Sequence, residues 1–309
     1  LQVGQLVAFI EYLFHAMFSL MLFSNVFVMY PKAQVSAERI EEVLTSETII
    51  KDPVQGVTET NNEGTLVFND VTFTYPDGEE PVIKNVSFKA KKGETIAFIG
   101  STGSGKSTLI NLIPRFYDVT GGSIKIDGID VRDFKIKSLR QKIGFIRQKT
   151  LLFTGSIKSN IKFGKQEASH DEVVESAKTA QAYDFISKKE LKFDEPIGEG
   201  GSNVSGGQKQ RLSIARALVR KPEIYIFDDS FSALDFKTDA ILRAELKKET
   251  ADAIVLIVAQ RIGSIMEADK IIVLDEGKVV GCGKHKELLK SCSVYKEIAL
   301  SQLTEEELA

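Results

Sequence analysis

The sequence has few of the residues that build disulfide frameworks or metal centres. Cys282 and Cys292 are the two cysteines among 309 residues, and neither has a histidine or cysteine partner at metal-ligand spacing. We interpret them as ordinary surface or core thiols of a reducing compartment. The sequence also lacks long runs of like charge, and 40 Lys and Arg against 43 Asp and Glu give a net charge of −3. This balance offers no basic surface for nucleic acid, so no nucleic-acid partner is expected.

The N-terminal segment differs sharply from the rest of the chain. Residues 6–30 (LVAFIEYLFHAMFSLMLFSNVFVMY) are almost entirely apolar, and as a helix they would extend roughly 37 Å, enough to cross a bilayer. A signal peptide would have a basic start and a shorter apolar core. Glu11, His15 and Ser19 share one helical face, as residues facing a bundle interior or a water-filled path do. The alternative is a buried helix of a soluble protein.

Composition divides the chain into four regions. The first residue is leucine rather than methionine, so we expect the sequence to be part of a longer chain. Residues 1–33 are predicted to contain a transmembrane helix. Residues 34–64 begin as a charged amphipathic helix and continue as a polar linker without periodicity. A compact domain is expected over residues 65–303, followed by a C-terminal tail at 304–309.

Apolar strands and helical segments alternate within the compact domain. The strands are predicted in the segments ETIAFIG, SIKIDG, KIGFIRQ, EIYIFDD, AIVLIVAQ and KIIVLDEG. Helices are predicted at 107–113, 170–189 and 206–219 and around 239–248. Such alternation predicts an α/β fold with a largely parallel sheet covered on both faces.

A glycine-rich motif connects the first of these parallel strands to a helix. It fits G-x-x-x-x-G-K-[ST] and comprises Gly100, Ser101, Thr102, Gly103, Ser104, Gly105, Lys106, Ser107 and Thr108. The glycines let backbone amides turn toward a β-phosphate, and the helix N-terminus adds a favourable dipole. Lys106 supplies a positive charge for the β- and γ-phosphates, and Ser107 offers its hydroxyl to Mg²⁺. The motif therefore predicts a site for a nucleoside triphosphate and its magnesium ion.

A second strand carries an acidic residue to the same edge of the sheet. Residues 224–227 are apolar and end at Asp228, at the carboxyl end of the strand, where ligands bind in such sheets. A carboxylate there can hold magnesium through the water shell of the ion. In a domain that also contains the glycine-rich loop, Asp228 is a strong candidate metal ligand.

A third motif, NVSGGQKQR at residues 203–211, completes the set. Together the three motifs resemble the ATP-binding cassette of membrane transporters, and the resemblance covers roughly residues 65–303. It implies a P-loop NTPase cassette: a RecA-like core with antiparallel β and helical subdomains, on the cytoplasmic side of a membrane. The preceding apolar helix suits an exporter with fused domains and six membrane helices per subunit, of which it would be the last.

The resemblance also implies roles for individual residues. Tyr75 matches the aromatic residue that stacks on adenine, although a core or strand-edge tyrosine is the alternative. Gln148 matches the glutamine that contacts Mg²⁺ and the attacking water, and whose loop meets the membrane domain. Residues 232–235 match the loop that crosses the dimer interface. The γ-phosphate of ATP held by the other subunit would be bound by Ser205, Gly206, Gly207 and Gln208.

Two positions depart from the family pattern. The family normally has glutamate after the metal-binding aspartate, where it polarises the attacking water, and this chain has Asp229. The shorter side chain withdraws the carboxylate by roughly 1.5 Å, from a position where about 1 Å matters. At the position of the family's switch histidine stands Gln260, which can donate hydrogen bonds but carries neither a proton for transfer nor a positive charge.

Intact binding groups combined with altered catalytic groups are typical of one half of a heterodimeric exporter. The resemblance implies an ATPase subunit that powers export, with ATP and Mg²⁺ as cofactors. Its own catalytic site, formed by Asp229, Gln260 and Gln148, would be impaired, while its intact signature would serve the partner's site. The expected partners are a second ABC subunit, the transmembrane domain of the same protein and membrane lipid. The alternatives are a homodimer with slow turnover, a module that binds ATP persistently, and a soluble ABC ATPase of DNA repair or translation.

Overall fold

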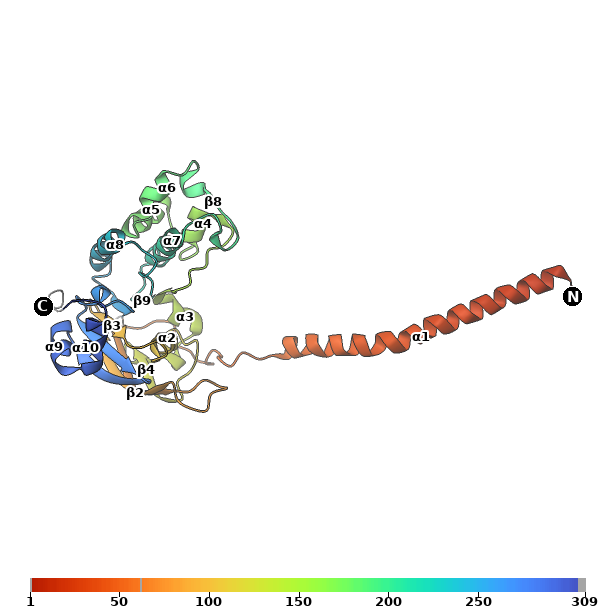
Figure 1. The fold of residues 1–309 in the computed structure, drawn as a ribbon, viewed down its shortest axis with the longest axis horizontal. Coiled ribbons are helices and arrows are strands. Elements are labelled where there is room, and N and C mark those ends of the chain that lie inside the picture. Colours follow the sequence, from red (N-terminus) through yellow and green to blue (C-terminus); the bar gives the residue numbers. More distant parts are fainter. Residues whose placement is uncertain (1, 62, 305–309) are drawn as a thin grey trace. The chain divides into compact units, whose positions relative to one another are not determined.

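The computed structural model describes residues 2–61 and 63–304, which form two compact units divided after Ile49. The first unit is built on one helix of 43 residues, α1 (Val3–Thr45), shown in red and orange in Figure 1. The helix is long and apolar enough to cross a membrane, and none of its residues is buried within the chain. It therefore does not pack as a core helix of this chain.

Helix α1 continues through Pro31 into the charged segment. Proline lacks a backbone N–H, so this position contributes no intrahelical hydrogen bond. The polar face predicted from the sequence bonds to the helix itself: the Ser19 hydroxyl donates to the carbonyl of His15 at 2.8 Å, and His15 Nδ1 lies 2.9 Å from the carbonyl of Glu11. Such internal bonding satisfies polar side chains in an apolar environment.

The centre of the second unit is a six-stranded sheet in the order β12-β11-β3-β10-β9-β6. Its strands are β3 (Thr95–Ile99), β6 (Ile143–Ile146), β9 (Ile224–Asp228), β10 (Ile254–Val258), β11 (Lys270–Asp275) and β12 (Lys278–Gly283). All neighbours are parallel except β12, which pairs antiparallel with β11 at one edge. The predicted apolar strands thus form a largely parallel sheet whose central members are buried on both faces.

A second, antiparallel sheet has the order β2-β1-β4-β5. It comprises β1 (Thr65–Phe73), β2 (Ile83–Lys91), β4 (Gly121–Ile126) and β5 (Ile129–Asp130). Buried and exposed side chains alternate along β2, as expected for a strand with one face on a core. Phe68 on β1 lies opposite Phe88 on β2, and their rings stack at 4.4 Å.

The α-helices of the second unit are α2 (Lys106–Leu112), α3 (Ile136–Gln141), α4 (Ile157–Lys162), α5 (His170–Thr179), α6 (Tyr183–Ser187), α7 (Gly206–Leu218), α8 (Phe236–Glu249), α9 (His285–Ser291) and α10 (Ser293–Leu300). Short elements complete the list: η1 (Val131–Asp133), η2 (Lys192–Asp194), η3 (Glu199–Gly201), η4 (Ile262–Ser264), β7 (Gly155–Ser156) and β8 (Pro196–Ile197). Some helices pack on the six-stranded sheet, whereas α4, α5 and α6 lie away from it in a group with α7 (Figure 1). The single helix predicted over residues 170–189 is two helices, because Gln181 adopts a left-handed conformation (φ 54°) between them.

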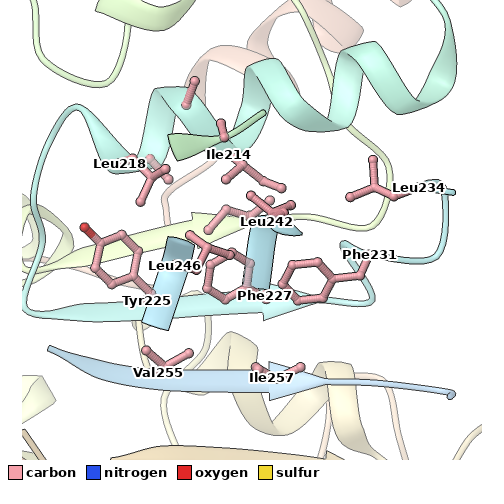
Figure 2. Packing of buried hydrophobic residues seen from close by; sticks show 14 of the residues in the cluster. Ile214, Leu218, Tyr225, Phe227, Phe231, Leu234, Leu242, Leu246, Val255 and Ile257 are labelled. Carbon is pink, nitrogen blue, oxygen red and sulfur yellow. The ribbon is translucent and has the colours of Figure 1, made fainter. Parts of the chain in front are cut away.

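One of the two cores lies between the sheet and helices α7 and α8. Figure 2 shows the side chains of β9 and β10 that face these helices, and those of the helices that meet them. The cluster includes Tyr225, Phe227, Val255 and Ile257 from the strands and Ile214, Leu218, Leu242 and Leu246 from the helices. This packing fixes the strand end that carries Asp228 relative to the helix that begins at Gly206.

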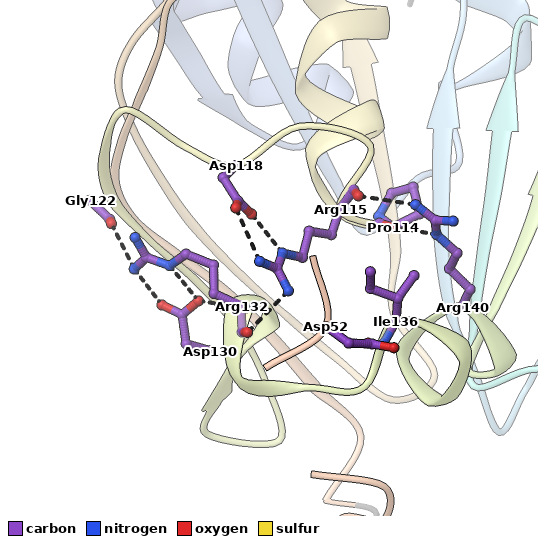
Figure 3. Close-up of polar contacts among 9 residues, drawn as sticks. All are labelled: Asp52, Pro114, Arg115, Asp118, Gly122, Asp130, Arg132, Ile136 and Arg140. Atoms are coloured by element: carbon purple, nitrogen blue, oxygen red, sulfur yellow. Dashed lines mark hydrogen bonds and ion pairs between the residues drawn. The ribbon is translucent and has the colours of Figure 1, made fainter. Parts of the chain in front are cut away.

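The start of the segment predicted as a linker forms hydrogen bonds to the second unit. An Asp52 carboxylate oxygen accepts a hydrogen bond from the Ile136 backbone N–H at 2.6 Å, and Lys135 Nζ donates to the Pro53 carbonyl at 2.9 Å. Figure 3 shows Asp52 at the start of α3, beside the arginines that join the neighbouring loops. Among these, Arg115 pairs with Asp118 at 2.7 Å and donates to the carbonyl of Arg132 at 3.1 Å.

Candidate active site

The glycine-rich loop begins where β3 ends and leads directly into α2. Gly103 and Gly105 adopt positive φ angles of 84° and 95°, and Gly105 is the N-cap of α2. A Cβ atom at Gly105 would lie 2.8 Å from Ile83 Cδ1 and 3.1 Å from the Val82 carbonyl oxygen. Only glycine fits this position. The loop therefore leads straight into the helix, whose first-turn amide groups have no carbonyl partners within the helix.

Lys106 is held by the oxygen atoms of the loop. Its Nζ donates to the carbonyls of Gly100 at 2.8 Å and Ser101 at 2.7 Å, and to the Ser104 hydroxyl at 3.2 Å. Burial lowers the pKa of Lys106, and the charges of Asp228 and Asp229 oppose this change. The ammonium group is thus fixed at the concave side of a loop suited to a phosphate.

Ser107 and Asp228 meet across the start of α2 and the end of β9. The Ser107 hydroxyl donates to Asp228 Oδ1 at 3.1 Å. Burial raises the pKa of Asp228, and the hydrogen bond from Ser107 opposes this rise. A hydroxyl and a carboxylate side by side are the hard oxygen ligands that Mg²⁺ prefers, so this pair fits the ion predicted from the sequence.

Two of the three residues predicted to be catalytic converge on a carboxylate oxygen of the third. Gln148 Nε2 donates to Asp229 Oδ2 at 2.8 Å, and Gln260 Nε2 donates to the same oxygen at 2.9 Å. Asp229 itself has a left-handed backbone (φ 46°) at the turn after β9. Burial raises the pKa of Asp229, and the hydrogen bond from Gln148 opposes this rise. The arrangement engages an oxygen of Asp229 that would otherwise be available to a water molecule.

Tyr75 lies beside α2, the helix that follows the glycine-rich loop. Its hydroxyl is 3.0 Å from the Thr108 hydroxyl, and its ring makes edge contacts with Phe73 at 4.9 Å and Tyr117 at 5.2 Å. The structure therefore brings Tyr75 beside the loop that is separated from it by some thirty residues of sequence. Its position is compatible with the predicted contact to a nucleotide base.

The NVSGGQKQR motif forms the start of α7 and is turned toward solvent. Ser205 is the N-cap: its hydroxyl accepts from the Gln208 N–H at 3.3 Å, and Gln208 Oε1 accepts from the Ser205 N–H at 3.1 Å. Ser205 and Gly206 are exposed, and Gly207 and Gln208 are half-exposed. Within the described residues, no hydrogen bond joins this segment to the glycine-rich loop of the same chain.

The sequence did not single out two residues that hold the loops of this site. Arg216 of α7 lies 5.3 Å from the ring of Phe153 and 5.7 Å from that of Phe163, and it donates to the Leu151 carbonyl at 3.0 Å. It thereby ties the chain after Gln148 to α7. Gln302 contacts the loop of Gln260. The arginine within the apolar pattern of α7 could have indicated a structural role for Arg216. The sequence near Gln302 gives no indication that this residue contacts the loop of Gln260.

The fold and the motifs define a P-loop nucleotide-binding cassette, and comparison with known proteins makes this specific. A family model described as "ABC transporter" matches residues 83–232. An uncharacterized ABC transporter ATP-binding protein of Mycobacterium bovis is 42% identical over 311 residues, which cover 98% of this chain and 52% of the relative. A Staphylococcus aureus protein described as a multidrug export ATP-binding/permease protein is 46% identical over 236 residues, covering 76% and 41%.

A solved structure agrees with these relatives. The structure of a bacterial Atm1-family ABC exporter with ATP bound is similar with a TM-score of 0.82 at 32% identity, covering 96% of this chain and 52% of the exporter chain. The chain thus contains an ABC transporter ATP-binding domain related to bacterial exporters, and the expected cassette fold is confirmed. The chain spans about half the length of the curated relatives it matches.

Proposed function

We propose that this chain is the ATP-binding and ATP-hydrolysing part of an ABC exporter subunit that works in a pair and whose own catalytic site is slow. The observation that supports the proposal concerns Asp229, whose side chain is shorter than the glutamate of the family. Its Oδ2 already accepts hydrogen bonds from Gln148 and Gln260. The binding groups around Lys106 are complete, so this site would hold ATP better than it cleaves it.

The binding half of the site follows from the loop geometry. Lys106 and the amide groups of the loop would hold the β- and γ-phosphates, and Tyr75 would stack on the adenine. Ser107 and Asp228 would hold Mg²⁺, directly and through its water shell, with Gln148 as a further ligand. Bound magnesium would neutralise charge that develops on the phosphates during cleavage.

The catalytic half is weaker on three counts. Asp229 reaches roughly 1.5 Å less far than glutamate, in a reaction where about 1 Å of misplacement is costly. Two amide donors already occupy Asp229 Oδ2, so this oxygen is engaged before it can accept a hydrogen bond from an attacking water. Gln260 can bind a phosphate oxygen but cannot supply the positive charge of a histidine. Gln148 would still orient the attacking water.

Pairing follows from the exposed start of α7. Ser205, Gly206, Gly207 and Gln208 present a helix N-terminus to solvent, and a second subunit could place its bound ATP against it. Residues 232–235 would cross the same interface. In a heterodimer this intact segment would complete the competent site of the partner, and in a homodimer both sites would be equally slow.

Attachment to a membrane is supported by two further features. Helix α1 has the length and composition of a membrane span. The cassette has a groove of about 270 Å³ beside the segment that contains Gln148. The residues that line it include Arg147, Leu151, Phe163 and Arg220. We infer that loops of the membrane domain dock there, and the resemblance to ABC exporters implies that the cassette lies on the cytoplasmic side.

Phosphate release by the purified full chain, alone and with candidate partner subunits, tests the proposal. We expect tight ATP binding, slow release by the chain alone, and faster release with a partner that carries glutamate and histidine at these two positions. Lys106→Ala should weaken ATP binding at least about tenfold, because it removes a charge-assisted contact, whereas Lys188→Ala on the exposed surface should not. Brisk turnover by the chain alone contradicts the slow site, and binding without turnover in any pairing identifies a persistent ATP-binding module.

A further inference from the structure

The side chain of Gln302 holds the loop that follows β10 at two points. Its Oε1 accepts a hydrogen bond from the Ile262 backbone N–H at 2.9 Å, and its Nε2 donates to the Gln260 carbonyl at 2.8 Å. One amide side chain therefore bonds the backbone on both sides of Arg261. Ile262 is the first residue of η4, whose N-cap has no side-chain hydrogen bond of its own, so Gln302 supplies that acceptor from a distant part of the chain.

Gln302 is itself placed by the C-terminal helix. Its backbone N–H donates to the Ala299 carbonyl at 3.1 Å, which continues the turn beyond α10. Ala299 and Tyr295 are fully buried, and the Tyr295 hydroxyl lies 2.7 Å from Nδ1 of the buried His285 in α9. The position of Gln302 is therefore determined by a packed pair of helices rather than by a loose terminus.

The loop fixed in this way carries groups that act on Asp229. The Gln260 side chain donates to Asp229 Oδ2 at 2.9 Å. Burial raises the pKa of Asp229, and the positive charge of Arg261 is among the influences that oppose the rise. On its far side the loop is held by Arg243, which donates from α8 to the Gly263 carbonyl at 3.1 Å. Among the described residues, no hydrogen bond joins Gln302 to the phosphate-binding residues.

We propose that Gln302 is a positioning residue of this ATPase: it fixes the backbone at Gln260 and Ile262 so that residue 260 reaches Asp229, and thereby links the C-terminal helices to the catalytic centre. Because Gln302 bonds to the backbone, the link acts on whichever side chain occupies position 260. Its effect on turnover rests on the proposed function, whereas its hold on the loop does not.

Amide hydrogen exchange in the purified full chain tests the hold on the loop. Gln302→Met keeps the length of the side chain without its polar atoms, and we expect the Ile262 amide to exchange about fivefold faster. Gln302→Glu retains the acceptor and should keep that amide protected. The control Ser301→Ala changes the neighbouring side chain, which bonds within its own turn, and should leave the loop unchanged. Unaltered exchange at Ile262 in Gln302→Met, or equal acceleration in Ser301→Ala, overturns the proposal.

Steady-state kinetics tests the link to catalysis, in a background with Asp229→Glu and Gln260→His. Adding Gln302→Met should lower kcat several-fold and leave KM for ATP unchanged, since the phosphate-binding residues are untouched; Ser301→Ala should change neither. A rise in KM with constant kcat, or no change in kcat, contradicts a positioning role. If the background itself shows no turnover, the proposed function has failed, and the exchange measurement still decides whether Gln302 holds the loop.

Discussion

At the scale of single residues, Asp229 differs from a freely available general base. Its Oδ2 is shared by amides from two loops, and a burial-raised pKa shows that ionisation there is costly. The residues of this centre were predicted from the resemblance to the ABC cassette. The convergence of Gln148 and Gln260 on one oxygen was not, because these residues lie 81 and 31 positions from Asp229 and meet only after the parallel sheet has formed.

The carboxylate of Asp228 is partly buried next to the glycine-rich loop. Burial raises its pKa in the folded state, so its ionised form lowers the free energy of unfolding at neutral pH in the absence of nucleotide. Asp228→Asn should therefore raise the Tm of the free protein at pH 7.5. The gain should shrink as the pH falls through the folded-state pKa, where the wild-type carboxyl becomes protonated as well.

Thermal denaturation at several pH values, with and without MgATP, measures both effects of this substitution. The same variant should lose most of the Mg²⁺-dependent stabilisation by ATP, because it removes a carboxylate to which we assign a contact with magnesium. An increase in Tm that is independent of pH would contradict the assignment of the effect to ionisation of Asp228.

At the scale of secondary-structure elements, features encoded by local sequence were predicted, whereas features that depend on long-range contacts were not. The glycine-rich loop and the start of α7 were predictable because their motifs are continuous in sequence. The binding of residues 50–61 to α3 was not, because Asp52 and Ile136 are 84 residues apart and the segment has no periodicity. The break between α5 and α6 was missed because a left-handed Gln181 interrupts an otherwise helical pattern.

The start of α7 allows a matched test. Ser205 and Ser169 both form capping boxes, at α7 and α5 respectively. Replacing either by alanine should lower the free energy of unfolding by about 1 kcal/mol. Only Ser205→Ala should also reduce ATP hydrolysis at the partner's site, since Ser169 lies on a helix to which we assign no nucleotide contact.

Chemical denaturation and ATPase assays of the paired complex compare the two variants. Equal losses of activity in Ser205→Ala and Ser169→Ala would mean that the effect is one of stability, and the role of α7 in the partner's site would be contradicted.

At the scale of the whole molecule, the chain divides after Ile49 into a helical unit and a cassette. The apolar composition of α1 predicted a membrane span, and the structure leaves its apolar side chains exposed, as a span requires. The sequence predicted an apolar helix followed by a compact domain, but the regions that it predicted, 1–33, 34–64 and 65–303, do not coincide with a division after Ile49. It could not show that the cassette extends back to residue 50, since this depends on contacts with η1 and α3.

This division predicts different solubility for the two units. Residues 50–309 should remain monodisperse without detergent, whereas the full chain should require detergent or lipid, because the apolar face of α1 is covered by nothing in the described chain. Size-exclusion chromatography with light scattering checks the difference. A full chain that is monodisperse in plain buffer would instead favour the soluble ATPase.

In the proposed function, this chain binds ATP well and cleaves it poorly because of two side chains, Asp229 and Gln260. Phosphate release at saturating MgATP, from the wild type and from the Asp229→Glu, Gln260→His double variant, tests it most directly. We expect a rise in turnover of at least about tenfold, in keeping with the contribution of a positioned general base, with an unchanged Kd for ATP. Equal turnover in the two proteins, with ATP bound equally well, would contradict it.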